Sequence, residues 1–296
     1  MMDLTLTGMG NRFVALFCAV LLAAVSCTKV RSYDVPVVED YGITIISASI
    51  EPLDIEGLGK LDGHDWTPED SLGVYGSERG ENVAYVPFSD GSLNRFCGDI
   101  VKGDIMLYYP YRKDGCDAAR DNRMPLPAEV SYRDNASDFI FSNLTFVTGG
   151  DTDNFSFPFP LSLVKMTLEL DLTELSKVSV TVSNVSQGYD EYLCGDMALD
   201  SRQPYLKNPG KTLEISGIGG RSVGEKAPLD LWFALPEGKY ENFIVGFEMS
   251  SGESVVQLCK GPLQTKKRCL TTCKVVEYKP EYSLGDYGSE EGGFKE

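Results

Sequence analysis

Histidine and paired carboxylates are the side chains best suited to acid–base chemistry, and this sequence offers few of them in useful places. Histidine occurs once, at His64, which excludes any site that needs two histidines, including the common zinc-hydrolase arrangements. A serine hydrolase would have to take His64 from a polar Gly-His-Asp loop, and the sequence has no nucleophile elbow. We therefore expect His64 to be a surface loop residue.

Adjacent acidic residues occur at Glu69 and Asp70, and again at Glu290 and Glu291. Glycosidases hold two carboxyl groups at a defined separation across a cleft, and neighbours in a loop or tail do not establish such a pair. Because Asp and Glu are rarely buried, we expect these pairs to be solvated. The sequence thus predicts a protein that is not an enzyme, with no catalytic residue, no metal site and no cofactor.

Cysteine is the other reactive side chain, and six of the eight cysteines lie beyond residue 30. No Cys-x-x-Cys pair occurs, so zinc knuckles and thioredoxin-like redox motifs are unsupported. An exported protein can oxidise its thiols. Cys97 with Cys116, which bracket one expected strand, and Cys259 with Cys269 or Cys273, across a Gly-Pro turn, are candidate disulfides. Six reduced, packed thiols are the alternative.

Cys27 follows a segment with the layout of a signal peptide. One basic residue, Arg12, precedes an apolar run over residues 13–25, and small residues ending in Ser26 come directly before Cys27. The run is shorter than the roughly 20 residues that a membrane-spanning helix needs. A cysteine after small residues resembles the bacterial lipobox. This resemblance implies cleavage between Ser26 and Cys27 and acylation of the Cys27 thiol.

The expected product is a lipid-anchored protein of the outer membrane or cell surface, since two or more acyl chains anchor stably. Residues 28–31 lack the acidic cluster expected of surface-export tags, and Asp34 is the first acidic residue after Cys27. The sequence therefore does not decide on which face of the outer membrane the protein lies. Asp3 and Arg12 cancel in the removed segment, so the mature chain keeps the net charge of −17. This charge argues against nucleic acid and against anionic lipid surfaces as partners.

Short apolar stretches bounded by turn residues follow a polar tether, and helix-period stripes are hard to find. Several alternate at period two, which is typical of strands with one buried face. Many short strands with turns between them indicate β-sandwiches. The one helical candidate, around residues 173–177, is very short. The expected strands are 42–50, 72–75, 83–88, 105–109, 139–147, 163–172, 178–185, 213–215, 229–235, 243–249, 255–259 and 269–278.

A break at Gly149-Gly150-Asp151 separates two series of strands, each about the size of one sandwich. We therefore predict an all-β chain with two tandem sandwich domains, and we expect a mobile acidic tail. The predicted segments are a signal peptide (1–26), a lipidated tether (27–40), an N-terminal sandwich (41–154), a C-terminal sandwich (155–282) and a Gly-rich acidic tail (283–296).

Five short motifs, in this order and spacing, resemble segments of the Bacteroidales fimbrillin-like proteins. They are a Trp-to-Tyr segment from Trp66 to Tyr75, a Tyr-Tyr-Pro-Tyr run at 108–111, Asp-Phe-Ile at 138–140, alternating Phe residues at 155–159, and Leu-Asp-Leu-Trp-Phe-Ala-Leu-Pro-Glu-Gly from Leu229 to Gly238. The resemblance covers almost all of the mature chain.

The resemblance implies two transthyretin-like sandwich domains and a structural role. In that family a trypsin-like protease removes an N-terminal segment with the first strand, and a neighbouring subunit fills the vacated groove, so that a pilus grows. The physical basis is strand addition to an open sheet edge. On this basis residues 42–50 form the covering strand. The family typically has an arginine soon after it, whereas here Lys60 in a Gly-rich loop is the basic residue that could be cut.

The first hypothesis is accordingly a fimbrial subunit or adhesin, with neighbouring subunits, the outer membrane and possible host or bacterial surface ligands as partners. If Lys60 is not cut, the chain keeps its lipid as a pilus anchor subunit or a stand-alone surface lipoprotein. A stand-alone lipoprotein could bind glycans through exposed aromatic rings. Large aromatics in strands are more often core, so we expect Tyr108 and Trp232 to be buried.

Overall fold

The computed structural model describes residues 43–61, 64–78, 80–89, 92–182, 192–199 and 206–275. The predicted signal peptide, Cys27, the tether and the acidic tail lie outside the described residues. By its internal contacts the chain divides into two units, Met1–Thr44 and Ile45–Glu296. Of the first unit only Ile43 and Thr44 are described, and both belong to the first strand.

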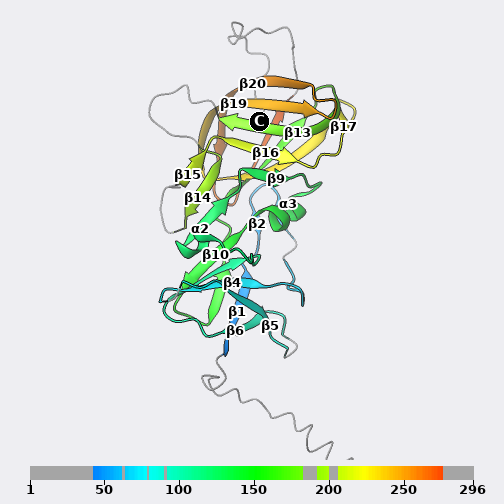
Figure 1. Ribbon diagram of the computed structural model, residues 1–296. Coiled ribbons are helices and arrows are strands. Elements are labelled where there is room, and N and C mark those ends of the chain that lie inside the picture. Colours follow the sequence, from blue (N-terminus) through cyan, green and yellow to red (C-terminus); the bar gives the residue numbers. More distant parts are fainter. Residues whose placement is uncertain are drawn as a thin grey trace, which may run out of the picture. The chain divides into compact units, whose positions relative to one another are not determined.

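Strands make up most of the described chain, which confirms the predicted all-β class. Seven of them form one sheet in the order β10-β7-β4-β5-β6-β1-β11 (Figure 1). Its strands β4, β5, β7 and β10 pair antiparallel, and β1 pairs parallel with β11. The bounds are β1 Ile43–Ile50, β4 Leu72–Gly76, β5 Val83–Pro87, β6 Arg95–Asp99, β7 Ile105–Tyr109, β10 Phe146–Gly150 and β11 Asn154–Phe157.

The later part of the chain forms a three-stranded sheet, β18-β12-β21, and a larger sheet with the path β20-β19-β13-β16-β9, to which β17 adds beside β13. Strand β12 pairs antiparallel with β18 and parallel with β21. The bounds are β12 Ser162–Leu168, β13 Leu172–Val182, β16 Thr212–Ser216, β17 Arg221–Val223, β18 Leu229–Leu235, β19 Gly238–Met249, β20 Ser254–Thr265 and β21 Leu270–Val275.

Some strands pair with partners far away in the sequence. Strand β9 (Glu129–Ser131) lies parallel to β16 at the end of the larger sheet, and β8 (Arg123–Leu126) joins β14 (Cys194–Ala198) and β15 (Leu206–Gly210) in a small sheet. Strand β11 spans the predicted boundary near residue 155. The division into two domains stays a prediction.

Strand β13 shows why the sequence pattern works. Val178, Val180 and Val182 are buried, and the residues between them are partly exposed, as period two requires. The candidate helix at 173–177 was wrong, because these residues belong to β13. Glu174 has a φ of 54°, and the register shifts around Leu175, so the segment is a β-bulge.

The strand predicted over residues 139–147 was also wrong in its first half. Residues Ala136–Asn143 form helix α3, and β10 starts only at Phe146. The Asn135 side chain caps the helix by accepting a hydrogen bond of 2.9 Å from the Asp138 backbone N–H. A second, shorter helix, α2, spans Asp117–Arg120. Among the described residues, no helix has the length and apolar character to cross a bilayer.

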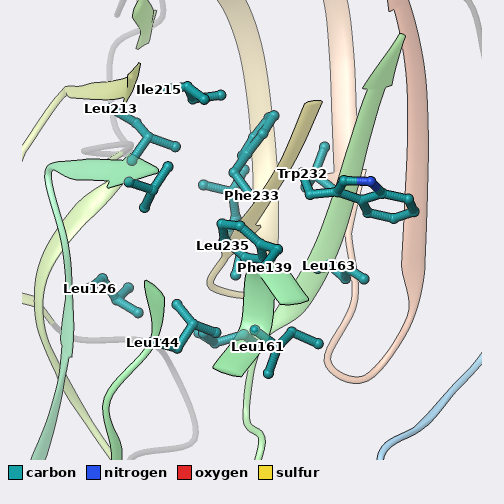
Figure 2. Close-up of a cluster of buried hydrophobic side chains, with 14 of the residues drawn as sticks. Leu126, Phe139, Leu144, Leu161, Leu163, Leu213, Ile215, Trp232, Phe233 and Leu235 are labelled. Atoms are coloured by element: carbon teal, nitrogen blue, oxygen red, sulfur yellow. The ribbon is translucent and has the colours of Figure 1, made fainter. Parts of the chain in front are cut away.

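Helix α3 contributes to the buried core. Phe139 of α3 and Leu144 at its C-terminal end lie in the same cluster as Phe233 and Leu235 of β18 (Figure 2). Strand β18 is buried along almost its whole length, which means that both faces of its sheet are covered.

Candidate site at the first strand

Strand β1 is an interior strand, although the chain enters the sheet with it. It lies between β6 and β11. Beside β11 the register runs from Ser47 opposite Asn154 to Ile50 opposite Phe157. On the β6 side, the Ala48 backbone N–H donates to the Asn94 carbonyl at 2.9 Å. Both edges of β1 are therefore used in hydrogen bonding.

One face of β1 is buried and the other is partly exposed. Ile46 and Ala48 are almost fully buried, whereas Ser49 is exposed. This alternation follows from the side-chain period of two in a strand. The buried side chains belong to the same core cluster as four aromatic rings, those of Trp66, Phe96, Tyr109 and Phe157, which we call the aromatic floor.

Trp66 is the residue at the centre of this aromatic floor. Its indole N–H donates a buried hydrogen bond of 2.9 Å to the Ala48 carbonyl oxygen. Its ring packs edge-on against Phe96 of β6 and Tyr109 of β7, with centroids 5.1 Å and 4.9 Å away, and lies 6.5 Å from Phe157 of β11. The floor thus includes a ring from each strand that flanks β1.

A cluster of hydrogen-bonded polar groups, from His64, Thr67, Asp70 and Tyr109, fixes the Tyr109 ring of this floor. The Tyr109 hydroxyl donates to Asp70 Oδ1 at 2.6 Å, and His64 Nε2 lies 2.9 Å from that hydroxyl and 3.2 Å from Asp70 Oδ2. The Thr67 backbone N–H and hydroxyl also donate to Asp70 Oδ2, at 2.7 Å and 3.1 Å. His64, which we expected to be a surface loop residue, lies outside the helices and strands, but its side chain is only 19% exposed and is engaged in this cluster.

The charge state of this cluster follows from its hydrogen bonds. Burial alone would raise the pKa of Asp70, but the bonds from Tyr109 and Thr67 and the nearby His64 ring hold it below its usual value. Burial and the Asp70 carboxylate raise the pKa of Tyr109. Asp70 is therefore a carboxylate and Tyr109 a neutral donor at pH 7. The hydrogen bond to Asp70 therefore fixes the position of the Tyr109 ring, and the Trp66 ring packs against it.

The segment after β1 runs along a different sheet. Arg268 binds it twice, through Nη1 to the Glu51 carboxylate at 3.1 Å and through Nη2 to the Pro52 carbonyl at 2.6 Å. Glu56 then bridges to the start of β21: its N–H donates to the Arg268 carbonyl, and its carbonyl accepts from the Leu270 N–H. Glu56 therefore forms an isolated bridge beside Cys269, directly before β21.

Two buried side chains and a small hairpin complete this segment. Leu53 and Ile55 are 2% and 0% exposed. Strands β2 (Asp54–Ile55) and β3 (Gly59–Lys60) pair antiparallel, so Lys60 stands opposite Asp54. Lys60 is exposed. The sequence predicts a loop here, whereas the structure has a two-residue strand.

All six cysteines of the described chain are free thiols in the structure. Cys97 lies partly exposed in β6, and Cys116 is buried just before α2. The predicted Gly-Pro turn after Cys259 was wrong, because β20 continues through it to Thr265. Burial raises the pKa of Cys259 to about 12. Oxidation in the exported protein, for Cys97 with Cys116 or Cys259 with Cys269, remains a prediction.

The aromatic residues considered for glycan stacking are mostly core. Trp66, Tyr108, Tyr109 and Trp232 are each at most 8% exposed, which confirms the burial predicted for Tyr108 and Trp232. Trp232 lies at the side of the cluster in Figure 2, and the Lys165 ammonium stands 5.6 Å from the centre of its ring. These four rings do not form an exposed binding surface.

Sequence reasoning found β1, Lys60 and Trp66 but not their contacts. It missed Phe96 in the floor and Arg268 on the following segment. Phe96 lies in a short strand between turns, and Arg268 lies in a turn with a φ of 59°. Neither carries a periodic signal. Among the described residues, no cluster of three or more potential metal ligands is present.

No family model matches the chain, and no curated protein matches its sequence. A comparison with solved structures matches proteins from Bacteroides species and from Porphyromonas gingivalis, each with a TM-score below 0.5. A "putative cell adhesion protein" from Bacteroides ovatus is 13% identical, with 78% of this chain and 90% of that chain covered and a TM-score of 0.42. The tip fimbrial protein Mfa3 of Porphyromonas gingivalis, truncated at its C-terminus, is 10% identical, with coverages of 81% and 96% and a TM-score of 0.33. A "putative cell adhesion protein" from Bacteroides uniformis is 13% identical, with coverages of 80% and 94% and a TM-score of 0.33.

Proposed function

We propose that this chain is a non-enzymatic cell-surface adhesin or fimbrial subunit, exported as a lipoprotein acylated on Cys27 and assembled by donor-strand addition at the position of β1. One observation carries the proposal. An interior strand of a sheet is supplied by the N-terminal segment, and that segment ends in an exposed basic residue, Lys60. Lys60 is the only Lys or Arg between Arg31 and Arg79.

Cleavage after Lys60 would separate β1 from the rest of the chain without touching the strands beside it. The floor residues Trp66, Phe96, Tyr109 and Phe157 all follow Lys60 in the sequence. Once β1 leaves, β6 and β11 each present an unpaired edge. Unpaired edges accept strands from other chains, with main-chain hydrogen bonds giving affinity and alternate side chains giving fit.

Loss of the N-terminal segment without replacement would cost a large part of the folding free energy. Ile46, Leu53 and Ile55 are each at least 98% buried, and full burial of such a side chain stabilises by about 1.5–3 kcal/mol. Their combined loss would be comparable with the whole stability of a typical domain, about 5–15 kcal/mol. A processed chain therefore needs a donor strand to stay folded.

Processing at Lys60 would also decide the fate of the lipid. Cys27 lies on the same side of Lys60 as β1, so one cut would release both. The lipid then anchors the protein only during export to the outer membrane and is lost on cleavage. Without the cut, Cys27 is a permanent anchor, and the chain acts as a pilus anchor subunit or a stand-alone surface lipoprotein. Four of the rings considered for glycan binding, those of Trp66, Tyr108, Tyr109 and Trp232, are buried and do not support it.

The proposal is tested by substituting Lys60 and examining assemblies on cells. Lys60→Gln removes the basic residue that a trypsin-like protease needs. The proposal predicts high-mass assemblies of the parent on denaturing gels run without boiling, and none for Lys60→Gln. Lys60→Arg should keep them. Lys102→Gln, at another exposed lysine, is the matched control and should behave as the parent. Unchanged assemblies in Lys60→Gln would reject processing at this residue.

A further inference from the structure

The hydrogen bond between Trp66 and Ala48 lies beside the start of β6. Asn94, which directly precedes β6, accepts the Ala48 N–H. The Ala48 carbonyl is bound by the indole N–H of Trp66. At this position a side chain thus supplies a donor to the backbone of β1, as a neighbouring strand does elsewhere in a sheet.

Trp66 keeps its place through residues that do not belong to β1. Its ring packs on Phe96 and Tyr109, and Tyr109 is held in turn by Asp70. All of these residues lie beyond Lys60. A donor fixed in this way remains aimed at the same point after β1 is replaced, and a buried N–H left without an acceptor is costly.

The space beside this bond is small. Ala48 is 2% exposed and carries only a methyl group. Protein interiors are packed too densely to take extra methylene groups without strain. Two residues earlier, the buried Ile46 requires a large aliphatic side chain, while Ser49 on the partly exposed face allows any polar residue.

We infer that Trp66 is a positioning residue of the strand site: its indole N–H fixes the main-chain carbonyl at the position of Ala48, where the site admits a side chain no larger than Ala, with a large aliphatic residue two places before. This inference rests on the proposed strand exchange. It names the partner's chemistry, an alternating aliphatic–x–small strand. A strand with a bulky residue at the second position is rejected.

The test measures release of a labelled peptide, residues 43–52, from the mature chain nicked after Lys60, following exchange with its own N-terminal fragment. Trp66→Phe removes the N–H. Replacing Trp66 by 3-benzothienylalanine keeps the two-ring shape and removes only the N–H, so a folded variant is available if Trp66→Phe is unstable. Trp232→Phe is the matched control. Loss of one buried hydrogen bond should speed release about tenfold in the benzothienylalanine variant. Trp66→Phe also loses ring contacts, so its release should be at least as fast.

Peptide variants test the size limit. The peptide with Ala48→Leu should fail to enter, and the peptide with Ser49→Leu should enter as the parent peptide does. Equal release from parent and Trp66 variants, or entry of the Ala48→Leu peptide, overturns the inference and leaves strand exchange intact. Failure of the parent chain to take up any peptide instead overturns the proposed function, and the inference with it.

Discussion

Gly73, in the seven-stranded sheet, is a position where the ring of a neighbouring strand leaves no room for a side chain. A Cβ built on Gly73 would lie 1.9 Å from the buried Tyr108 ring. We predict that Gly73→Ala destabilises the protein by about 1–3 kcal/mol, as overpacking of a core does. Gly238→Ala is the control, because its Cβ would meet the Tyr240 ring at an ordinary 3.6 Å. Urea unfolding measures both, and equal midpoints would contradict the account.

Asp70 gives the second prediction at this scale. Its pKa in the folded chain is below the usual value of an aspartate, so its contribution to stability is complete above about pH 4 and is lost as the pH falls through the folded pKa. Asp70→Asn should therefore lower the melting temperature most at pH 7, and the difference from the parent should shrink below about pH 4. Glu69→Gln, next to it and exposed, is the control. A difference independent of pH would show that the carboxylate does not matter.

At the scale of elements, α3 depends on its cap. Asn135→Ala removes the side-chain acceptor for the Asp138 N–H, and loss of such a cap costs about 1 kcal/mol. Because α3 packs its Phe139 into the core, we expect this loss to appear in global unfolding. Ser142→Ala, at an exposed position of the same helix, should change the unfolding midpoint little. If the two substitutions lowered the unfolding midpoint equally, the Asn135 cap would not be what stabilises α3.

Arg268 is expected to control access to Lys60. Arg268→Gln removes the ion pair with Glu51 and the bond to the Pro52 carbonyl. Both charged groups are about a third exposed, so the stability change should stay below about 1 kcal/mol. The segment it holds should open more often, and limited trypsin digestion should cut after Lys60 severalfold faster. Lys267→Gln is the control, and an unchanged rate at Lys60 would contradict the prediction.

Elements with a strong period were predictable from the sequence. Strands such as β13 and β18 follow alternating or wholly apolar runs, and β1 follows its β-branched residues. Helix α3 was missed because the apolar run from Phe139 also suits a strand, and its cap at Asn135 was the only contrary signal. The pairing of β9 with β16 and the reach of Trp66 to Ala48 could not be predicted, because they depend on residues far apart in the chain.

For the molecule as a whole, net negative charge should oppose assembly of identical subunits. Residues 1–60 hold seven acidic and four basic side chains, so a chain cut after Lys60 keeps −14 of the net charge of −17. Salt shortens the range of this repulsion, from roughly 30 Å at 0.01 M to 8 Å at 0.15 M. We predict that the nicked chain assembles faster as NaCl rises over this range, with light scattering as the measurement. Peptide exchange at the β1 position, with an uncharged peptide, should depend far less on salt. Slower assembly at higher salt would contradict this prediction.

The central claim is that β1 leaves with the lipid and is replaced by a strand from another subunit. Mass spectrometry of the N-terminus of the protein in surface assemblies tests it most directly. The account predicts a chain that starts at Leu61, with no acylated Cys27. An intact, acylated Cys27 N-terminus in those assemblies would contradict it.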